Sequence, residues 1–163
     1  MHVLIWLQDS ALGTWVAGSI WGYPVILACH AVGMAAVAGT VVMINLRILG
    51  FARNVPITLF SRLSGIAWAG LVLNILTGLA LFSGDPVRFF YHPVFWIKIS
   101  LITLGVVSVW QVIRVLRRVD LSPAGMAGIP AGTKLVAGFS LAFWSGAIIA
   151  GRLIAYIEYG NGV

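Results

Sequence analysis

The sequence predicts an all-α, polytopic membrane protein whose four transmembrane helices form an antiparallel bundle. Of its 163 residues, 61% are hydrophobic and 9% are charged, whereas a soluble domain carries about 25% charged residues. Crossing a bilayer core takes about 20 helical residues. Apolar windows of that length cover residues 21–49, 58–82, 91–115 and 135–159. Lipid offers no partners to backbone N–H and C=O groups, so these windows must be helical. We therefore predict a single transmembrane domain over residues 1–163.

Residues 1–20, "MHVLIWLQDSALGTWVAGSI", precede the first span. They lack the basic n-region and the separate cleavage segment of a signal peptide, so we expect them to be retained. Trp6 and Trp15 are spaced for a short amphipathic helix that lies in the membrane interface, where indole rings prefer the headgroup boundary. His2 is interpreted as a surface residue of this interfacial segment.

The first and second spans are joined by a short connection, which predicts that they are antiparallel neighbours. Between the second and third spans, "FSGDPVRFFYHP" predicts a short interfacial helix capped by Asp85 and Pro86, with Pro93 in the first turn of the third span. Before the fourth span, "RRVDLSPAGMAGIPAGTK" is rich in Gly, Pro and Ala and predicts a flexible cytoplasmic loop.

The positions of the cations predict the topology. Seven of the ten Lys and Arg residues flank the first-to-second and third-to-fourth connections: Arg47, Arg53, Arg62, Arg114, Arg117, Arg118 and Lys134. By the positive-inside rule this end is cytoplasmic. Both termini then lie on the periplasmic side of a bacterial inner membrane. The net charge of +6 does not predict nucleic-acid binding, because the cations are scattered at helix ends and form no basic patch.

Four polar residues fall inside the spans: His30, Asn74, Lys98 and Arg152. From the rise per helical residue, three of them lie roughly 8 to 12 Å from the outer boundary and Asn74 about one turn deeper. A charged side chain near the bilayer centre costs about 2.5 to 3.5 kcal/mol. Glu158 is six residues after Arg152 and on a different face. Compensation for Lys98 and Arg152 must come from snorkelling, from a neighbouring subunit or from an anionic ligand.

Haem b meets this demand, because its iron takes an axial imidazole and its two propionates need cationic partners. We interpret His30 as the axial ligand of the haem iron, and Lys98 with Arg152 as propionate partners. Gly33 would leave space beside the ring, and Asn74, or Thr77 one turn on, would orient the ligand. The alternatives stay open. His30 can be a hydrogen-bonded histidine of a helix bundle, and small residues such as Gly33, Gly146 and Gly151 can equally serve close helix packing.

His92 is a candidate second ligand of the iron. It is six residues from Lys98, so on a straight helix the two side chains point about 120° apart. Unless Pro93 kinks the helix, His92 lies on a flank, where it would act as an interfacial cap instead. Cys29 is the single cysteine, which excludes an internal disulfide and a CxxCH haem attachment site.

The stretches "WGYPVILACHAVGMAAVAG", "NLRILG", "WAGLVLNILTGLALF", "HPVFWIK" and "WSGAIIAGRLIAY" carry a family resemblance. The chain resembles small bacterial four-helix inner-membrane proteins that are similar to CopD-like and cytochrome-b-like bundles. The resemblance covers nearly the whole chain and implies a bundle whose marked positions are His30, Arg47, Lys98 and Arg152. This chain has Asn45 where relatives tend to carry Asp, and His92 where they tend to carry Asn.

Three functions follow as hypotheses. The first is a haem-b-binding subunit that carries electrons between a periplasmic redox protein and quinone or a larger membrane complex. The second is a non-catalytic accessory subunit that binds lipid or quinone beside other membrane subunits or in a homo-oligomer. The third is a small anion or metal transporter. The sequence contains no nucleophile–base pair, metal-ligand cluster or phosphate loop, so the chain is at most the electron-transfer subunit of an oxidoreductase.

Overall fold

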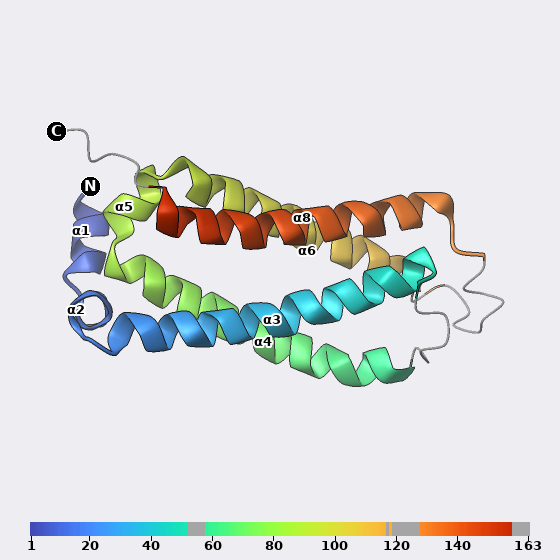
Figure 1. Cartoon of the computed structure of the whole chain (residues 1–163), viewed down its shortest axis with the longest axis horizontal. Coiled ribbons are helices and arrows are strands. Elements are labelled where there is room, and N and C mark those ends of the chain that lie inside the picture. Colours follow the sequence, from blue (N-terminus) through green and yellow to red (C-terminus); the bar gives the residue numbers. More distant parts are fainter. Residues whose placement is uncertain (52–57, 117, 119–127, 158–163) are drawn as a thin grey trace. The chain divides into compact units, whose positions relative to one another are not determined.

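The computed structural model describes residues 1–51, 58–116, 118 and 128–157, with the side chains of residues 58–64 and Ala155 excepted. All regular elements in these ranges are helices (Figure 1). Four of them are long and apolar enough to cross a membrane. They are α3 (Gly22–Leu49), α4 (Thr58–Gly84), α6 (Pro93–Leu116) and α8 (Ala131–Tyr156). This confirms the prediction of an all-helical chain with four helices able to span a membrane, and it fits a multi-pass membrane protein.

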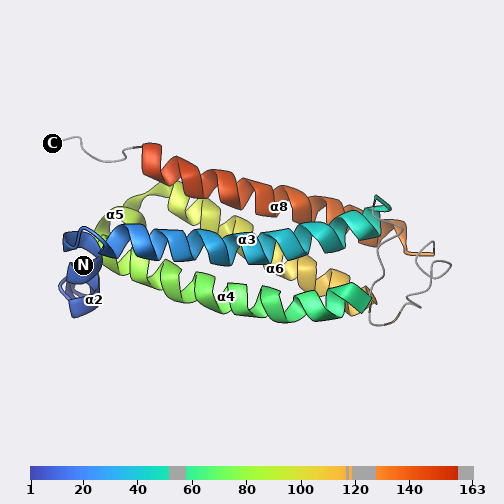
Figure 2. The ribbon, with the colours of Figure 1, turned by 60° about the horizontal axis from the view of Figure 1, so that its bottom comes forward.

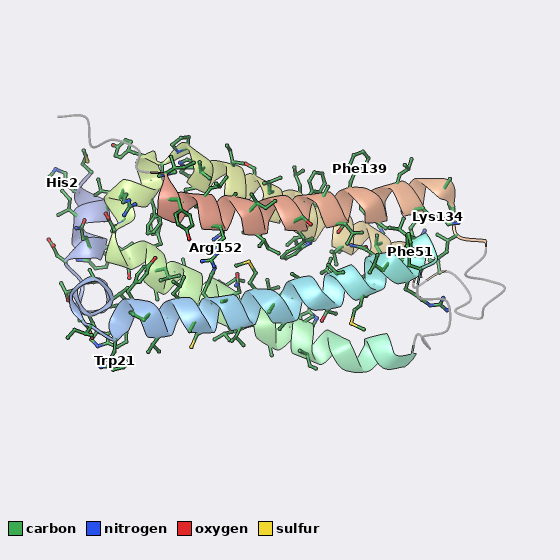
Figure 3. The ribbon with its side chains drawn as sticks, in the orientation of Figure 1. His2, Trp21, Phe51, Lys134, Phe139 and Arg152 are labelled. Carbon is green, nitrogen blue, oxygen red and sulfur yellow. The ribbon has the colours of Figure 1, made fainter. Side chains whose placement is uncertain are left out.

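The first span agrees with its predicted bounds, and its end has a local cause. The N–H of Gly50, whose φ is 93°, bonds the carbonyl of Arg47 at 3.1 Å, and the N–H of Phe51 bonds that of Leu46 at 3.0 Å. These two bonds form a Schellman motif, in which glycine adopts the left-handed conformation at no steric cost. Figure 3 shows Trp21 just before the start of α3 and Phe51 after its end.

The third span begins two residues later than predicted, and proline is the reason. The short helix α5 (Pro86–Tyr91) is present as predicted, and the Asp85 side chain accepts a bond from the N–H of Arg88 at 3.3 Å. His92 then takes an extended conformation (φ −84°, ψ 114°), because the ring of Pro93 disfavours helical geometry at the preceding residue. Tyr91 and His92 therefore lie outside α6.

The fourth span begins at Ala131, four residues before the predicted start, directly after the extended Pro130 (ψ 142°). Its last predicted residues, Glu158 and Tyr159, lie outside the described residues, as do parts of both predicted cytoplasmic connections.

The N-terminal segment contains two short helices where the sequence predicted one. These are α1 (His2–Gln8) and α2 (Ala11–Gly18). Ser10 separates them, since its hydroxyl accepts a bond from the N–H of Gly13 at 3.1 Å and so caps the start of α2. Trp6 and Trp15 are exposed, at 72% and 47%. Their position in the membrane interface stays a prediction.

The chain divides into two compact units. Unit 1 comprises Met1–Val37 and Gly65–Pro93, and unit 2 comprises Ala38–Ser64 and Val94–Val163. In unit 1, α3 and α4 lie side by side (Figure 2). A Cβ atom on Gly33 would lie 2.9 Å from the carbonyl oxygen of Gly70, so the two backbones meet here without intervening side chains. His30, one turn earlier on α3, contacts Thr77, which is two turns later than Gly70 on α4. Because earlier residues of α3 contact later residues of α4, the two segments run in opposite directions.

Unit 2 places α6 beside α8. A Cβ atom on Gly105 would lie 2.9 Å from Nε1 of Trp144, and one on Gly146 would lie 3.2 Å from Leu101. Later residues of α6 thus contact earlier residues of α8. These two helices therefore also run in opposite directions. The second half of α3 joins them through a hydrophobic cluster of Ile48, Val112, Ile129 and Ala137.

The contact between Gly33 and Gly70 predicts a position-specific effect of adding one methyl group. Gly33→Ala should destabilise the protein by about 1 to 3 kcal/mol, because the new Cβ meets backbone that cannot turn away. Thermal unfolding in detergent measures the effect. The matched control is Gly39→Ala on the same helix, where a Cβ would have no neighbour within 4 Å. Equal melting temperatures for the two variants would contradict the assignment.

Candidate functional site

Unit 1 buries His30 on α3 and holds it at two points from α4. The side chain is 7% exposed, and its Nδ1 lies 3.0 Å from the Thr77 hydroxyl oxygen. Asn74 lies one turn before Thr77 on α4, and its Nδ2 donates to the backbone carbonyl of His30 at 2.9 Å. The structure thus brings together His30, Asn74 and Thr77, which the sequence proposed as a ligand and its orienting groups.

The hydroxyl of Thr77 fixes the proton on the His30 ring. Its oxygen lies 2.6 Å from the carbonyl of Leu73 and 3.3 Å from that of Asn74. A carbonyl can only accept, so the single hydroxyl proton is donated within α4, as Thr commonly does in helices. The Thr77 oxygen must then accept from Nδ1–H of His30. In the neutral ring this assignment puts the lone pair on Nε2, which is the nitrogen that can bind iron or accept a hydrogen bond.

Two glycines fit closely around this arrangement. A Cβ on Gly78 would lie 3.3 Å from Cε1 and 3.7 Å from Nδ1 of His30, so Gly78 gives the imidazole its room. A Cβ on Gly33 would lie 3.0 Å from the backbone nitrogen of Asn74. Gly33 therefore serves the helix contact that brings Asn74 to His30, and a contact of Gly33 with a cofactor stays a prediction. Sequence reasoning missed Gly78, which its spacing from Asn74 places on the same face of α4.

Unit 2 holds the two candidate cations. Lys98 on α6 lies against α8, where its Cε and Nζ would be 3.5 Å from a Cβ on Gly151. Arg152 is the next residue of α8 and its side chain is exposed. The described part of unit 2 contains no Asp or Glu, so neither cation has an acidic partner there. Glu158 lies outside the described residues.

His92 lies at the C-cap of α5 in unit 1, where its backbone N–H donates to the carbonyl of Phe89 at 3.2 Å. The residue is 1% exposed. Both the role of His92 as an interfacial cap and iron ligation by His92 stay predictions. Across the described residues, no group of three or more His, Cys, Asp or Glu side chains could hold a metal ion.

Sequence reasoning gave no role to a set of buried polar atoms in unit 2. Four of these atoms have no hydrogen-bond partner among the described residues: Asn45 Nδ2, Arg47 Nε, Ser140 Oγ and Trp144 Nε1. From the sequence, Asn45 was noted only through the family resemblance, and Arg47 only there and as one of the cytoplasmic cations. Helical periodicity could have placed Asn45 and Ser140 on buried faces, since both lie within a turn of apolar core residues.

Comparison with known proteins returned no match to a family model, a curated protein or a solved structure. The resemblance to four-helix inner-membrane proteins stays a prediction from the residues quoted above.

The proton assignment predicts the tautomer of His30. In protein carrying ¹⁵N-labelled histidine, neutral His30 should show a protonated Nδ1 and an unprotonated Nε2. Thr77→Val removes the acceptor and should shift this population toward the other tautomer, whereas Thr77→Ser keeps the hydroxyl and should preserve it. The ¹⁵N chemical shifts of the ring measure both populations. A dominant Nε2–H form in the wild-type protein would contradict the assignment.

Proposed function

We propose that this chain is a haem-b-binding subunit of the bacterial inner membrane that carries electrons between a periplasmic redox protein and quinone or a larger membrane complex. The observation that carries the proposal is the environment of His30. A haem ligand needs an unprotonated ring nitrogen and a fixed ring orientation, and histidines that bind metals usually donate their other N–H to a fixed acceptor. The contacts of His30 with Thr77 and Asn74 meet these requirements.

His30 would hold the haem iron through Nε2, and bound haem would supply reversible one-electron chemistry. Thr77 keeps the proton on Nδ1, and Asn74 fixes the backbone turn that carries the ring. Gly78 leaves the ring its space. Because this side of α3 packs directly on α4, the orientation of the imidazole is set before any ligand binds.

Lys98 and Arg152 support the proposal through their charge. Each propionate of haem carries one negative charge, and the described part of unit 2 offers these two cations no acid of its own. Pairing with carboxylates would relieve the cost of placing cations within apolar helices. We propose these two side chains as the propionate partners.

The proposed arrangement is an antiparallel bundle of the four apolar helices, with both termini on the periplasmic side. The exposed indole rings of Trp6, Trp15 and Trp21 support an interfacial position for the N-terminal segment on that side. Arg47 in the last turn of α3 and Arg114 in the last turn of α6 support a cytoplasmic position for the opposite helix ends.

The pyridine haemochrome assay on purified variants tests the proposal. His30→Ala should abolish haem binding, whereas His2→Ala, which alters an exposed histidine of α1, should leave the haem content unchanged. Lys98→Ala and Arg152→Ala should each weaken haem retention by about tenfold, the equivalent of about 1.4 kcal/mol for a lost charge-assisted contact. Lys134→Ala is the matched control for the cations. Full haem content in His30→Ala would contradict the proposal.

One observation favours a second candidate, a non-catalytic accessory subunit that binds lipid or quinone. Arg152 is exposed on α8, and two large apolar side chains on the same face of the helix, Ile149 and Tyr156, are exposed at 59% and 76%. A surface of this kind suits contact with another membrane subunit or a second copy of the chain.

If this second candidate holds, native mass spectrometry of the chain extracted in mild detergent should find assemblies. Arg152→Ala should shift them toward single chains, because a cation at a buried contact would lose its partner. Arg118→Ala, at an exposed residue outside α6 and α8, is the control. Single chains alone in the wild-type sample would contradict the accessory role.

A further inference from the structure

We infer that unit 2 contains a second site, independent of the proposed haem ligands, that binds an uncharged hydrogen-bond acceptor between α3, α6 and α8. Its donors are the Asn45 amide, the Ser140 hydroxyl and the Trp144 indole N–H. Each side chain is more than nine-tenths buried, at 1%, 0% and 7% exposed, respectively. None of the three donor atoms has a hydrogen-bond partner among the described residues.

Asn45 faces the other two helices. Its neighbours Ile44, Ile48 and Leu49 all belong to or pack against the hydrophobic cluster that α3 shares with α6 and α8. At 3.6 residues per turn, the Asn45 side chain points about 60° from Ile48 and about 40° from Leu49. It therefore lies between two side chains that contact the cluster. Asn45 is a polar position on an otherwise apolar contact face.

Ser140 and Trp144 lie on the matching face of α8. Ala137, which is in the cluster, precedes Ser140 by three residues and Trp144 by seven, so all three point to one side. On α6, Val112 is in the cluster and Gly105 packs against Trp144. This fixes the register, and it places Ser108 of α6 at the level of Ser140.

Asn45 lies one turn from a cluster residue on α3, as Ser140 does on α8. The second half of α3 runs beside α8 in the opposite direction, and its C-terminal end lies near the start of α8 (Figures 1 and 2). Ile48 and Ala137 both belong to the cluster, so the turn before Ile48 on α3 and the turn after Ala137 on α8 extend from it in the same direction. These turns hold Asn45 and Ser140, about 13 Å along α8 from its first residue.

The chemistry of the donors defines the ligand. The indole N–H and the amide NH₂ can only donate, and a serine hydroxyl can donate. Ser108 already donates its proton to the carbonyl of Gly105 at 2.8 Å, so its lone pairs add an acceptor and no further donor. The described part of unit 2 places no acid here. These three donors carry no charge, and the charged Arg47 points about 160° away from Asn45 around α3. The donors therefore call for neutral acceptor atoms, each of which takes at most two of the bonds, since buried donors are nearly always bonded. Ordered water and a quinone carbonyl both provide one.

The melting temperatures of Ser140→Ala and Asn45→Leu test for an occupant. If an acceptor is bound, each substitution should lower the melting temperature by about 2 to 4 °C, because a hydrogen bond is lost. If the donors have no partner, removing them should leave the melting temperature unchanged or raise it. Ser145→Ala, at an exposed serine of the same helix, is the matched control and should show no change.

The indole N–H resonance of Trp144, assigned with Trp144→Phe in ¹⁵N-tryptophan-labelled protein, identifies the source of the acceptor. A cross-peak to water identifies ordered water. A shift of the resonance when decylubiquinone is added to the detergent micelles identifies a quinone carbonyl. The inference is overturned if both variants melt at or above the wild-type temperature, or if the resonance shows neither signal.

Discussion

The backbone contact between Gly33 of α3 and Gly70 of α4 is the constraint on which the candidate ligand site depends. Lipid gives apolar helices no hydrophobic reason to associate, so close packing and interhelical hydrogen bonds must hold them together. With no Cβ at either glycine, the helices approach closely enough for Asn74 to bond the His30 carbonyl at 2.9 Å and for Thr77 to accept from its ring. The same contact thus packs the helices and orients the imidazole.

Charge imposes a second constraint, in unit 2. Lys98 and Arg152 are cations on apolar helices, and the described part of this unit holds no acid. Within the described part, compensation is left to groups that bind to unit 2, to lipid headgroups or to neighbouring chains. This requirement is common to the haem proposal, in which propionates supply the charge, and to the accessory role, in which a partner or a lipid does.

Much of the fold could be predicted from the sequence, because hydropathy and length determine which segments can cross a membrane. The late start of α6 follows from the restriction that Pro93 places on His92, which a hydropathy window does not register. The division of the N-terminal segment at Ser10 follows from a cap that acts over only three residues. These local effects act over about three or four residues. The predicted helix bounds came from apolar windows of about 20 residues, which do not register them.

The candidate site was harder to predict, because the contacts between helices depend on their register. His30 and Asn74 could be proposed from their polarity alone, yet the role of Gly78 depends on which residue of α4 faces the ring. From the sequence alone Gly33 fitted both helix packing and a cofactor contact, and its part in the packing became evident only from the Gly70 carbonyl beside it. Asn45 and Trp144 likewise gained significance only when their burial without partners was known.

The central claim is that this chain binds haem b. The reduced-minus-oxidised absorbance spectrum of the purified wild-type protein tests it most directly. The account predicts a Soret band and an alpha band that change on reduction. A spectrum with protein absorbance alone, from folded protein produced in cells that supply haem, would contradict it.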